Sequence, residues 1–266
     1  MTSLLNTKNN PAVYLEGMNY TYGRKESCNQ VLFDNQLTLQ PGEIVCITGP
    51  SGSGKTTLLT LMGALRSVQE GSVNVLGAEL RGLKKRDQVN IRQKIGFIFQ
   101  SHNLFSSLTA RQNIYMALEL KKHTTKTKRA KAEKILTRLG LGERMDYKPQ
   151  KLSEGQRQRI AIGRALVNEP KLILADEPTA SLDQDSSQIV IDLLKDIAHE
   201  KNTTVFIVSH DQRAIDAGDR VVKMVDGKIT KCFSFACCAC MRHEFATRTS
   251  LYRFAMVMGP DAGRHL

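Results

Sequence analysis

A glycine-rich octapeptide in the first quarter of the chain restricts its possible folds more than any other feature. The octapeptide matches the pattern G-x-x-x-x-G-K-[ST] and reads Gly49-Pro50-Ser51-Gly52-Ser53-Gly54-Lys55-Thr56. It follows the apolar run 44–47 and precedes the helical pattern 57–63. Glycines let the backbone turn so that successive N–H groups point at phosphate oxygens, and the start of a helix adds its positive end. In such a loop Lys55 reaches the β- and γ-phosphates of a nucleotide, and the Thr56 hydroxyl ligates Mg²⁺.

A second apolar strand supplies the acidic half of a nucleotide site. The run 172–175 ends in Asp176 and Glu177. Open α/β sheets bind ligands at the carboxyl ends of their strands, so both acids are expected beside the phosphate loop. We predict that Asp176 holds Mg²⁺ through water and that Glu177 polarises the attacking water as a general base.

Strand patterns and helical patterns alternate along the chain. Residues 11–48 come close to period two, and continuous apolar runs typical of buried parallel strands lie at 95–99, 172–175 and 205–208. Helical patterns lie around 109–120, 128–139, 155–168 and 186–200. This alternation predicts an α/β fold. The stretch 101–168 carries several helical patterns and no convincing strand, so we interpret it as a helical insertion in the sheet domain.

The composition excludes several classes of protein. Of the 266 residues, 41% are apolar and 24% are charged, which is typical of a globular chain rather than a disordered or fibrous one. No apolar stretch approaches the length of about 18 residues that a membrane helix needs. The polar start at 1–11 lacks the apolar core of a secretory signal, so we expect a cytoplasmic protein. The net charge of +12 indicates an acidic partner without selecting one.

A third motif, Leu152-Ser153-Glu154-Gly155-Gln156, ends 20 residues before Asp176. Here the chain resembles the ATP-binding cassette (ABC) family, whose signature usually reads L-S-G-G-Q. The resemblance covers roughly residues 12–230, and the remaining family markers appear in order. These markers are Tyr22, which resembles the aromatic residue that stacks on adenine, Gln100 of the Q-loop, Ser181-Leu182-Asp183 of the D-loop and the switch histidine His210.

The resemblance implies a P-loop NTPase (RecA-like) fold with a parallel-sheet core, an antiparallel β subdomain and an inserted α-helical subdomain. It also implies an ATPase that binds ATP and Mg²⁺. The residues implied in nucleotide binding are Tyr22, Gly49, Pro50, Ser51, Gly52, Ser53, Gly54, Lys55, Thr56, Thr57, Ser153, Gly155, Gln156 and Asp183. The implied catalytic residues are Glu177, His210 and Gln100, and those implied at Mg²⁺ are Thr56, Gln100 and Asp176.

The family works as a head-to-tail dimer, in which the phosphate loop of one subunit and the signature of the other hold each ATP. The chain carries one cassette and no membrane span, so the resemblance implies a second copy and a separate membrane permease. It places the protein on the inner face of the cell membrane, with no nucleic acid as partner. A soluble cassette protein of DNA repair or translation is the alternative, although no tandem cassette or long coiled-coil insertion accompanies the motifs.

The signature departs from the family pattern at its third position, where Glu154 replaces glycine. In the family the serine and the fourth-position glycine make the main contacts with the opposite γ-phosphate, and both are present as Ser153 and Gly155. Ser153 and Gln156 also fit a capping box, and an acid in the first turn suits the helix dipole. We therefore interpret Glu154 as tolerated.

Within the family, the short chain resembles the lipoprotein-release and macrolide-export group. The amino-acid sequences of four segments are most similar to those of DevA-type ATPases, which serve glycolipid export with a membrane-fusion partner. These segments are 49–61, 66–71, 97–104 and 117–120. Two basic segments, 81–94 and 121–134, are interpreted either as solvated helix faces or as surfaces attracted to anionic lipid headgroups.

The last 36 residues, 231–266, do not resemble the rest of the chain. The turn Asp226-Gly227 predicts a hairpin whose last strand begins at Lys228 and ends near Thr230. Four cysteines follow at positions 232, 237, 238 and 240, a spacing unlike the usual zinc sites. We interpret 231–266 as a tail unrelated to the cassette, such as the product of an altered reading frame, with zinc binding and palmitoylation as alternatives.

Overall fold

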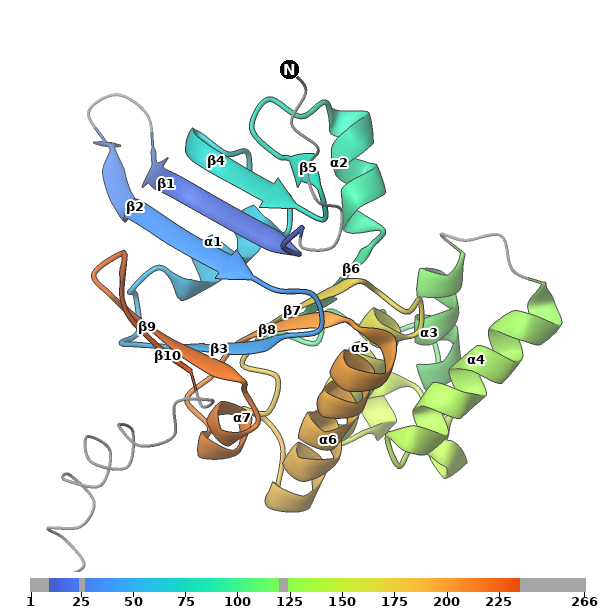
Figure 1. The fold of residues 1–266 in the computed structure, drawn as a ribbon. Coiled ribbons are helices and arrows are strands. Elements are labelled where there is room, and N and C mark those ends of the chain that lie inside the picture. Colours follow the sequence, from blue (N-terminus) through green and yellow to red (C-terminus); the bar gives the residue numbers. More distant parts are fainter. Residues whose placement is uncertain (1–9, 24–26, 120–123, 235–266) are drawn as a thin grey trace, which may run out of the picture.

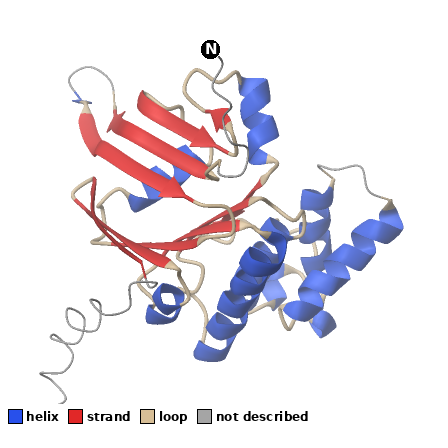
Figure 2. Cartoon of the chain, in the orientation of Figure 1, coloured by secondary structure: helices blue, strands red, loops and turns tan. Residues whose placement is uncertain are grey.

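Two β-sheets with a helix between them form the framework of the fold (Figures 1 and 2). The computed structural model describes residues 10–23, 27–119 and 124–234. Helix α1 (Lys55–Met62) contributes Leu58, Leu59 and Met62 to an apolar core that both sheets share. The phosphate loop at the start of α1 is thereby fixed between the two sheets.

The smaller sheet is antiparallel and has the strand order β2-β1-β4-β5. Its strands are β1 (Val13–Tyr22), β2 (Asn29–Leu39), β4 (Glu70–Val75) and β5 (Ala78–Glu79). The near period-two pattern of β1 and β2 is explained by this sheet, because alternate residues such as Val13 and Leu15 enter the core. The sequence pattern did not reveal β4 and β5, which are short and rich in polar residues.

The larger sheet has the order β10-β9-β3-β8-β7-β6, and its strands are parallel except for β10. Its strands are β3 (Ile44–Thr48), β6 (Ile95–Ile98), β7 (Leu172–Asp176), β8 (Thr204–Val208), β9 (Arg220–Val225) and β10 (Lys228–Ser234). Along β7, Leu172 and Leu174 face the core of α1, whereas Ile173 and Ala175 face a second core. Both faces are covered, which explains the continuous apolar runs.

Helices cover the second face of the larger sheet (Figure 2). Between β6 and β7 lie α3 (Ala110–Leu118), α4 (Thr125–Arg138), the short turns η2 (Gly142–Arg144) and η3 (Pro149–Lys151), and α5 (Glu154–Leu166). The described residues between β6 and β7 contain no strand, in agreement with the predicted helical insertion. The other helices are α2 (Lys85–Arg92), α6 (Gln184–Lys201) and α7 (Gln212–Asp216). Among the described residues, no helix combines the length and the apolar character needed to cross a membrane.

The C-terminal hairpin joins three parts of the chain. Asp226 and Gly227 both have positive φ, at 46° and 75°, as the predicted two-residue hairpin turn requires. The Gly227 carbonyl oxygen accepts hydrogen bonds from the Phe33 N–H at 3.0 Å and the Asn35 amide at 2.7 Å. The Gly227 N–H donates to the Ser53 carbonyl at 3.1 Å. The hairpin turn is therefore hydrogen-bonded to both the smaller sheet and the phosphate loop.

Strand β10 continues beyond the point at which the sequence pattern ends it. It reaches Ser234 rather than Thr230, and it pairs Cys232 with Val222 and Phe233 with Val221 of β9. The prediction failed because an edge strand is held by backbone hydrogen bonds, which need no regular apolar pattern on the exposed side. The other three cysteines of the cluster lie outside the described residues, and so does the rest of the predicted tail.

A comparison of two shortened chains tests the position of this boundary. A chain that ends after Thr230 loses four residues of β10 and should be roughly 1–2 kcal/mol less stable than one that ends after Ser234, because backbone pairs are lost. For a chain of this size that difference lowers the melting temperature by about 2–8 °C. Equal melting temperatures for the two chains would show that the last four residues of β10 contribute no stability.

Candidate active site

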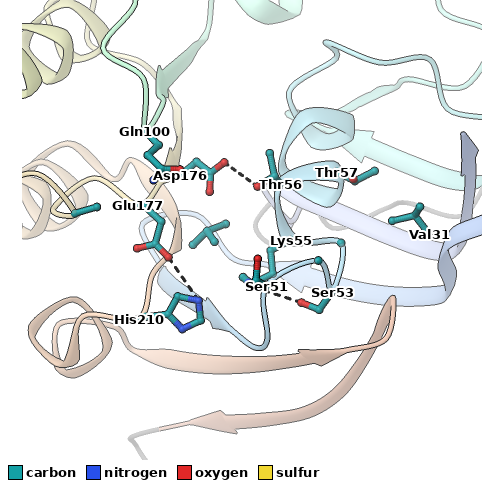
Figure 3. Close-up of a pocket in the computed structure, with 14 residues that line it drawn as sticks. Val31, Ser51, Ser53, Lys55, Thr56, Thr57, Gln100, Asp176, Glu177 and His210 are labelled. Carbon is teal, nitrogen blue, oxygen red and sulfur yellow. Dashed lines mark hydrogen bonds and ion pairs between the residues drawn. The ribbon is translucent and has the colours of Figure 1, made fainter.

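The predicted phosphate loop and acids meet in one cavity of about 510 Å³ (Figure 3). That volume is in the range of small-molecule sites. The cavity is lined by Val31, Ser51, Gly52, Ser53, Gly54, Lys55, Thr56, Thr57, Gln100, Asp176, Glu177, Ala180, Val208 and His210. The polar lining residues lie at the carboxyl ends of the parallel strands β3, β6, β7 and β8, either in the last residue of the strand or in the segment that follows it. Open α/β sheets place ligands at this edge.

The glycines of the phosphate loop are required by close packing at Gly49 and by a positive φ at Gly52. A Cβ atom at Gly49 would lie 1.9 Å from the Met224 carbonyl oxygen of β9. Gly52 has φ +78°, and a Cβ there would meet nothing within 4 Å, so the backbone at Gly52 is open to the cavity. Helix α1 begins after Gly54, and the first N–H groups of a helix have no acceptor within it. This cradle fits a phosphate group.

The Lys55 ammonium lies over the loop that precedes it. It donates to the carbonyl oxygens of Gly49 at 2.6 Å and Pro50 at 2.7 Å. Burial lowers the pKa of Lys55, while the Glu177 and Asp176 carboxylates act in the opposite direction. The ammonium is thus a positive charge with few solvent contacts, held where phosphates would approach the cradle.

Oxygen ligands suited to a hard divalent cation lie on one side of the cavity. The Thr56 hydroxyl donates to Asp176 Oδ2 at 2.8 Å, and Gln100 lines the cavity close to Asp176 (Figure 3). Burial raises the pKa of Asp176, although the hydrogen bond from Thr56 and the charge of Lys55 oppose the shift. Hydroxyl, carboxylate and amide oxygens are the donors that Mg²⁺ prefers, so these residues fit the predicted metal.

Glu177 is held in an unusual backbone conformation at the end of β7. Its φ of 48° lies in the left-handed region, which is strained for a residue with a side chain. Its Oε1 lies 3.7 Å from His210 Nε2, and its Oε2 accepts a hydrogen bond from the Ser209 hydroxyl at 3.5 Å. Burial raises the pKa of Glu177, and His210 and Lys55 oppose that rise while Asp176 adds to it. A raised pKa makes the carboxylate a stronger base.

Tyr22 lies next to the loop but outside the cavity lining. Its hydroxyl is hydrogen-bonded to the Thr57 Oγ1 at 3.0 Å, and the Arg66 guanidinium lies 4.8 Å from its ring centroid. The structure therefore brings Tyr22 to the first turn of α1, and Arg66 covers one face of its ring. The sequence pattern gave no sign of this contact, since the two residues are far apart in the chain.

The signature residues lie at the start of α5 and do not line the cavity of this chain. The Ser153 hydroxyl accepts a hydrogen bond from the Gln156 N–H at 3.2 Å, and the Gln156 side chain accepts one from the Ser153 N–H at 3.1 Å. The predicted capping box is therefore confirmed. Glu154 Oε1 accepts a hydrogen bond from the Ser181 hydroxyl at 3.3 Å.

The D-loop packs directly against the signature. A Cβ at Gly155 would lie 3.2 Å from Leu182 Cδ2 and 3.3 Å from the Ser181 carbonyl oxygen, so the glycine permits this contact. Asp183 caps α6 by accepting hydrogen bonds from the Ser186 N–H at 2.8 Å and hydroxyl at 3.0 Å. These hydrogen bonds hold the pKa of Asp183 below its ordinary value.

Sequence reasoning did not identify four residues of the site. Val31, Ala180 and Val208 line the cavity, and Ser209 bonds Glu177. The three apolar residues belong to no recognisable motif. Ser209 precedes His210 and directly follows the apolar run of β8, so its position just after a carboxyl strand end was the available signal.

Comparisons with known proteins agree with this geometry. The profile of the ABC transporter family matches residues 32–180, which is more than half of the chain. The lipoprotein-releasing system ATP-binding protein LolD of Pseudomonas syringae pv. tomato is 41% identical over 76% of this chain and 89% of its own length. The macrolide export ATP-binding/permease protein MacB of Marinobacter nauticus is 38% identical over 83% of this chain, which spans only 34% of that longer protein.

A solved structure has the same fold. The dimeric ATP-binding cassette MJ0796, in a post-hydrolysis state bound to ADP and Pi, superimposes with a TM-score of 0.80 at 36% identity. The match covers 84% of this chain and 98% of the solved one. It confirms the P-loop NTPase fold expected from the sequence. Taken with the family profile and the identity to LolD and MacB, it shows that the chain belongs to the ABC transporter family, as one of its ATPase cassettes.

Proposed function

We propose that the protein is the ATP-hydrolysing subunit of an ABC exporter and powers transport through a separate membrane permease. The observation that carries the proposal is the meeting of Lys55, Thr56, Asp176, Glu177 and His210 in one cavity. They come from three segments of the chain, and together they provide a phosphate cradle, oxygen ligands and a base. The named relatives are transport proteins, which favours this function over DNA repair or translation.

The hydrolytic step that we propose uses a carboxylate and a histidine of this chain. The loop amides and Lys55 hold the β- and γ-phosphates of ATP, and Thr56, Gln100 and Asp176 hold Mg²⁺. Bound Mg²⁺ supplies positive charge that offsets the charge on the phosphate oxygens. Glu177 accepts a proton from the water that attacks the γ-phosphorus, the bond to the β-phosphate oxygen breaks, and ADP and phosphate leave. His210 contacts the γ-phosphate.

The same proposal includes a head-to-tail dimer of two copies. Ser153, Gly155 and Gln156 lie outside the cavity of their own chain, so a role in ATP binding requires the cavity of another subunit. The D-loop, which includes Asp183, accompanies the signature, because its residues Ser181 and Leu182 pack against Gly155 of α5. The dimeric cassette structures that share this fold support the arrangement.

The named relatives support a permease partner and a location at the membrane. LolD is named as the ATP-binding protein of a lipoprotein-releasing system, and MacB as an ATP-binding/permease protein. We propose that this chain lies on the cytoplasmic face of the cell membrane against its permease. The resemblance to DevA-type ATPases supports a glycolipid or another hydrophobic substrate and a membrane-fusion protein reached through the permease.

Replacement of the base tests the chemistry. Glu177→Gln should retain ATP binding and accumulate a nucleotide-bound dimer, while turnover falls by about 10²–10⁴-fold because the base is lost. Lys55→Ala should instead weaken ATP binding, because it removes a positive charge from the phosphates. Steady-state ATPase assays and nucleotide titrations separate the two effects. Wild-type turnover of Glu177→Gln at saturating ATP would contradict the assignment.

The buried environment of Glu177 predicts the acid side of the pH profile. Hydrolysis needs the carboxylate, so turnover at saturating ATP should fall as the pH drops through a pKa above the ordinary 4.5 of glutamate. In His210→Gln the remaining activity should show this fall at a higher pH, because His210 lowers the pKa of Glu177. A turnover of His210→Gln that no longer falls at low pH would contradict the assignment of this fall to Glu177.

Two substitutions test the signature. Ser153→Arg should block dimer closure through a clash with the opposite nucleotide, while the monomer still binds ATP. Glu154→Gly should change turnover by less than about tenfold, or roughly 1.4 kcal/mol of barrier, because Glu154 is engaged by Ser181 of its own chain. ATPase assays and sizing of the nucleotide-bound dimer measure both effects. A hundredfold rise in the turnover of Glu154→Gly would show that Glu154 inhibits ATP hydrolysis in the wild type.

A further inference from the structure

One side chain of α5 connects the two loops that carry Gln100 and Glu177. Gln158 lies in the second turn of the helix and is 0% exposed, although it is an uncharged polar residue. Its Nε2 lies 3.5 Å from the Phe99 carbonyl oxygen and 3.3 Å from the Pro178 carbonyl oxygen. Phe99 directly precedes Gln100, and Pro178 directly follows Glu177.

The orientation of this amide is determined by its two neighbours. Both are carbonyl oxygens, which only accept hydrogen bonds, so the NH₂ group of Gln158 must face them. A flipped amide would place oxygen against two oxygens. The two N–H bonds of the amide therefore point at carbonyl oxygens of two separate loops, and the flipped amide could donate to neither.

The opposite end of the amide has no such partner. Gln158 Oε1 is buried and has no hydrogen bond within the described part of the chain. Both donor contacts are also at the long end of the range for hydrogen bonds. Buried polar groups normally find partners, and an exception in a native site calls for an explanation. A position that is polar, buried and incompletely bonded is poorly explained by stability alone.

Other contacts of α5 reach the same two loops. Arg164 donates to the carbonyl oxygens of Asn103 at 2.6 Å and His102 at 3.1 Å, just beyond Gln100. Gly155 packs against Leu182, just beyond Glu177. Gln158 lies between these contacts and bonds both loops at once. A small shift of α5 therefore changes the position of the peptide next to Glu177 and of the peptide next to Gln100.

We propose that Gln158 is a positioning residue for ATP hydrolysis, which transmits the position of the signature helix α5 to Glu177 and Gln100 of the same chain. The inference rests on the proposed ATPase function. Gln158 does not line the cavity, so it acts through the two loops and not on the nucleotide. It should therefore affect the rate of the chemical step and leave ATP binding nearly unchanged.

The test compares full-length variants at position 158. Gln158→Met keeps the length of the side chain and removes both N–H donors, and Gln158→Asn keeps the amide but shortens its reach. Each should lower kcat at least tenfold, while KM and the Kd for ATP stay within about threefold of wild type. Ile160→Val, a conservative change at a fully buried position of the same helix, is the matched control and should keep its kcat.

A double substitution separates positioning from general stability. Glu177→Gln already lacks the base, so adding Gln158→Met should reduce its residual turnover much less than it reduces that of the wild type. A purely structural role predicts the same reduction in both backgrounds, together with a lower melting temperature, and would overturn the inference. Normal kcat in both position-158 variants would also overturn it. A wild-type chain without ATPase activity would overturn the proposed function and this inference with it.

Discussion

Parallel pairing of β3, β6, β7 and β8 is the constraint on which the candidate site depends. The paired register sets Ile98 beside Ala175 and Asp176 beside Val208, so the loops that follow these strands emerge at one edge. Each strand is buried on both faces by alternate residues, which leaves no freedom for slippage. A shift of one residue would exchange the two faces of a strand, and the backbone hydrogen bonds and the apolar cores both oppose it.

The parts of the site that form locally could be predicted from the sequence. The phosphate loop, the start of α1, the capping box of Ser153 and Gln156 and the hairpin turn at Gly227 each depend on a few consecutive residues. The acids at the end of β7 were predictable because an apolar run followed by two acids indicates a buried strand with a polar end. Local patterning thus identified the fold class and most of the cavity.

Contacts between distant segments could not be predicted in this way. The stacking of Arg66 over Tyr22 and the bond from Ser209 to Glu177 arise from tertiary packing, which leaves no local period. The end of β10 was placed too early, because edge pairing tolerates a mixed pattern of polar and apolar residues. The sequence pattern did not identify Gln158 as a residue near the site for a related reason. A glutamine in a helix is normally a surface residue, and only its burial reveals its bonds to two loops.

The position of β3 within its sheet has a consequence for the order in which the protein can form. Strand β3 leads into the phosphate loop, yet its partners on either side are β8 and β9, which begin at Thr204 and Arg220. During synthesis at the ribosome, the segment that carries the nucleotide loop therefore emerges long before either neighbouring strand exists. Contacts of such large sequence separation form slowly. The candidate site can therefore be complete only after β8 and β9 have been made, when nearly the whole cassette has left the ribosome.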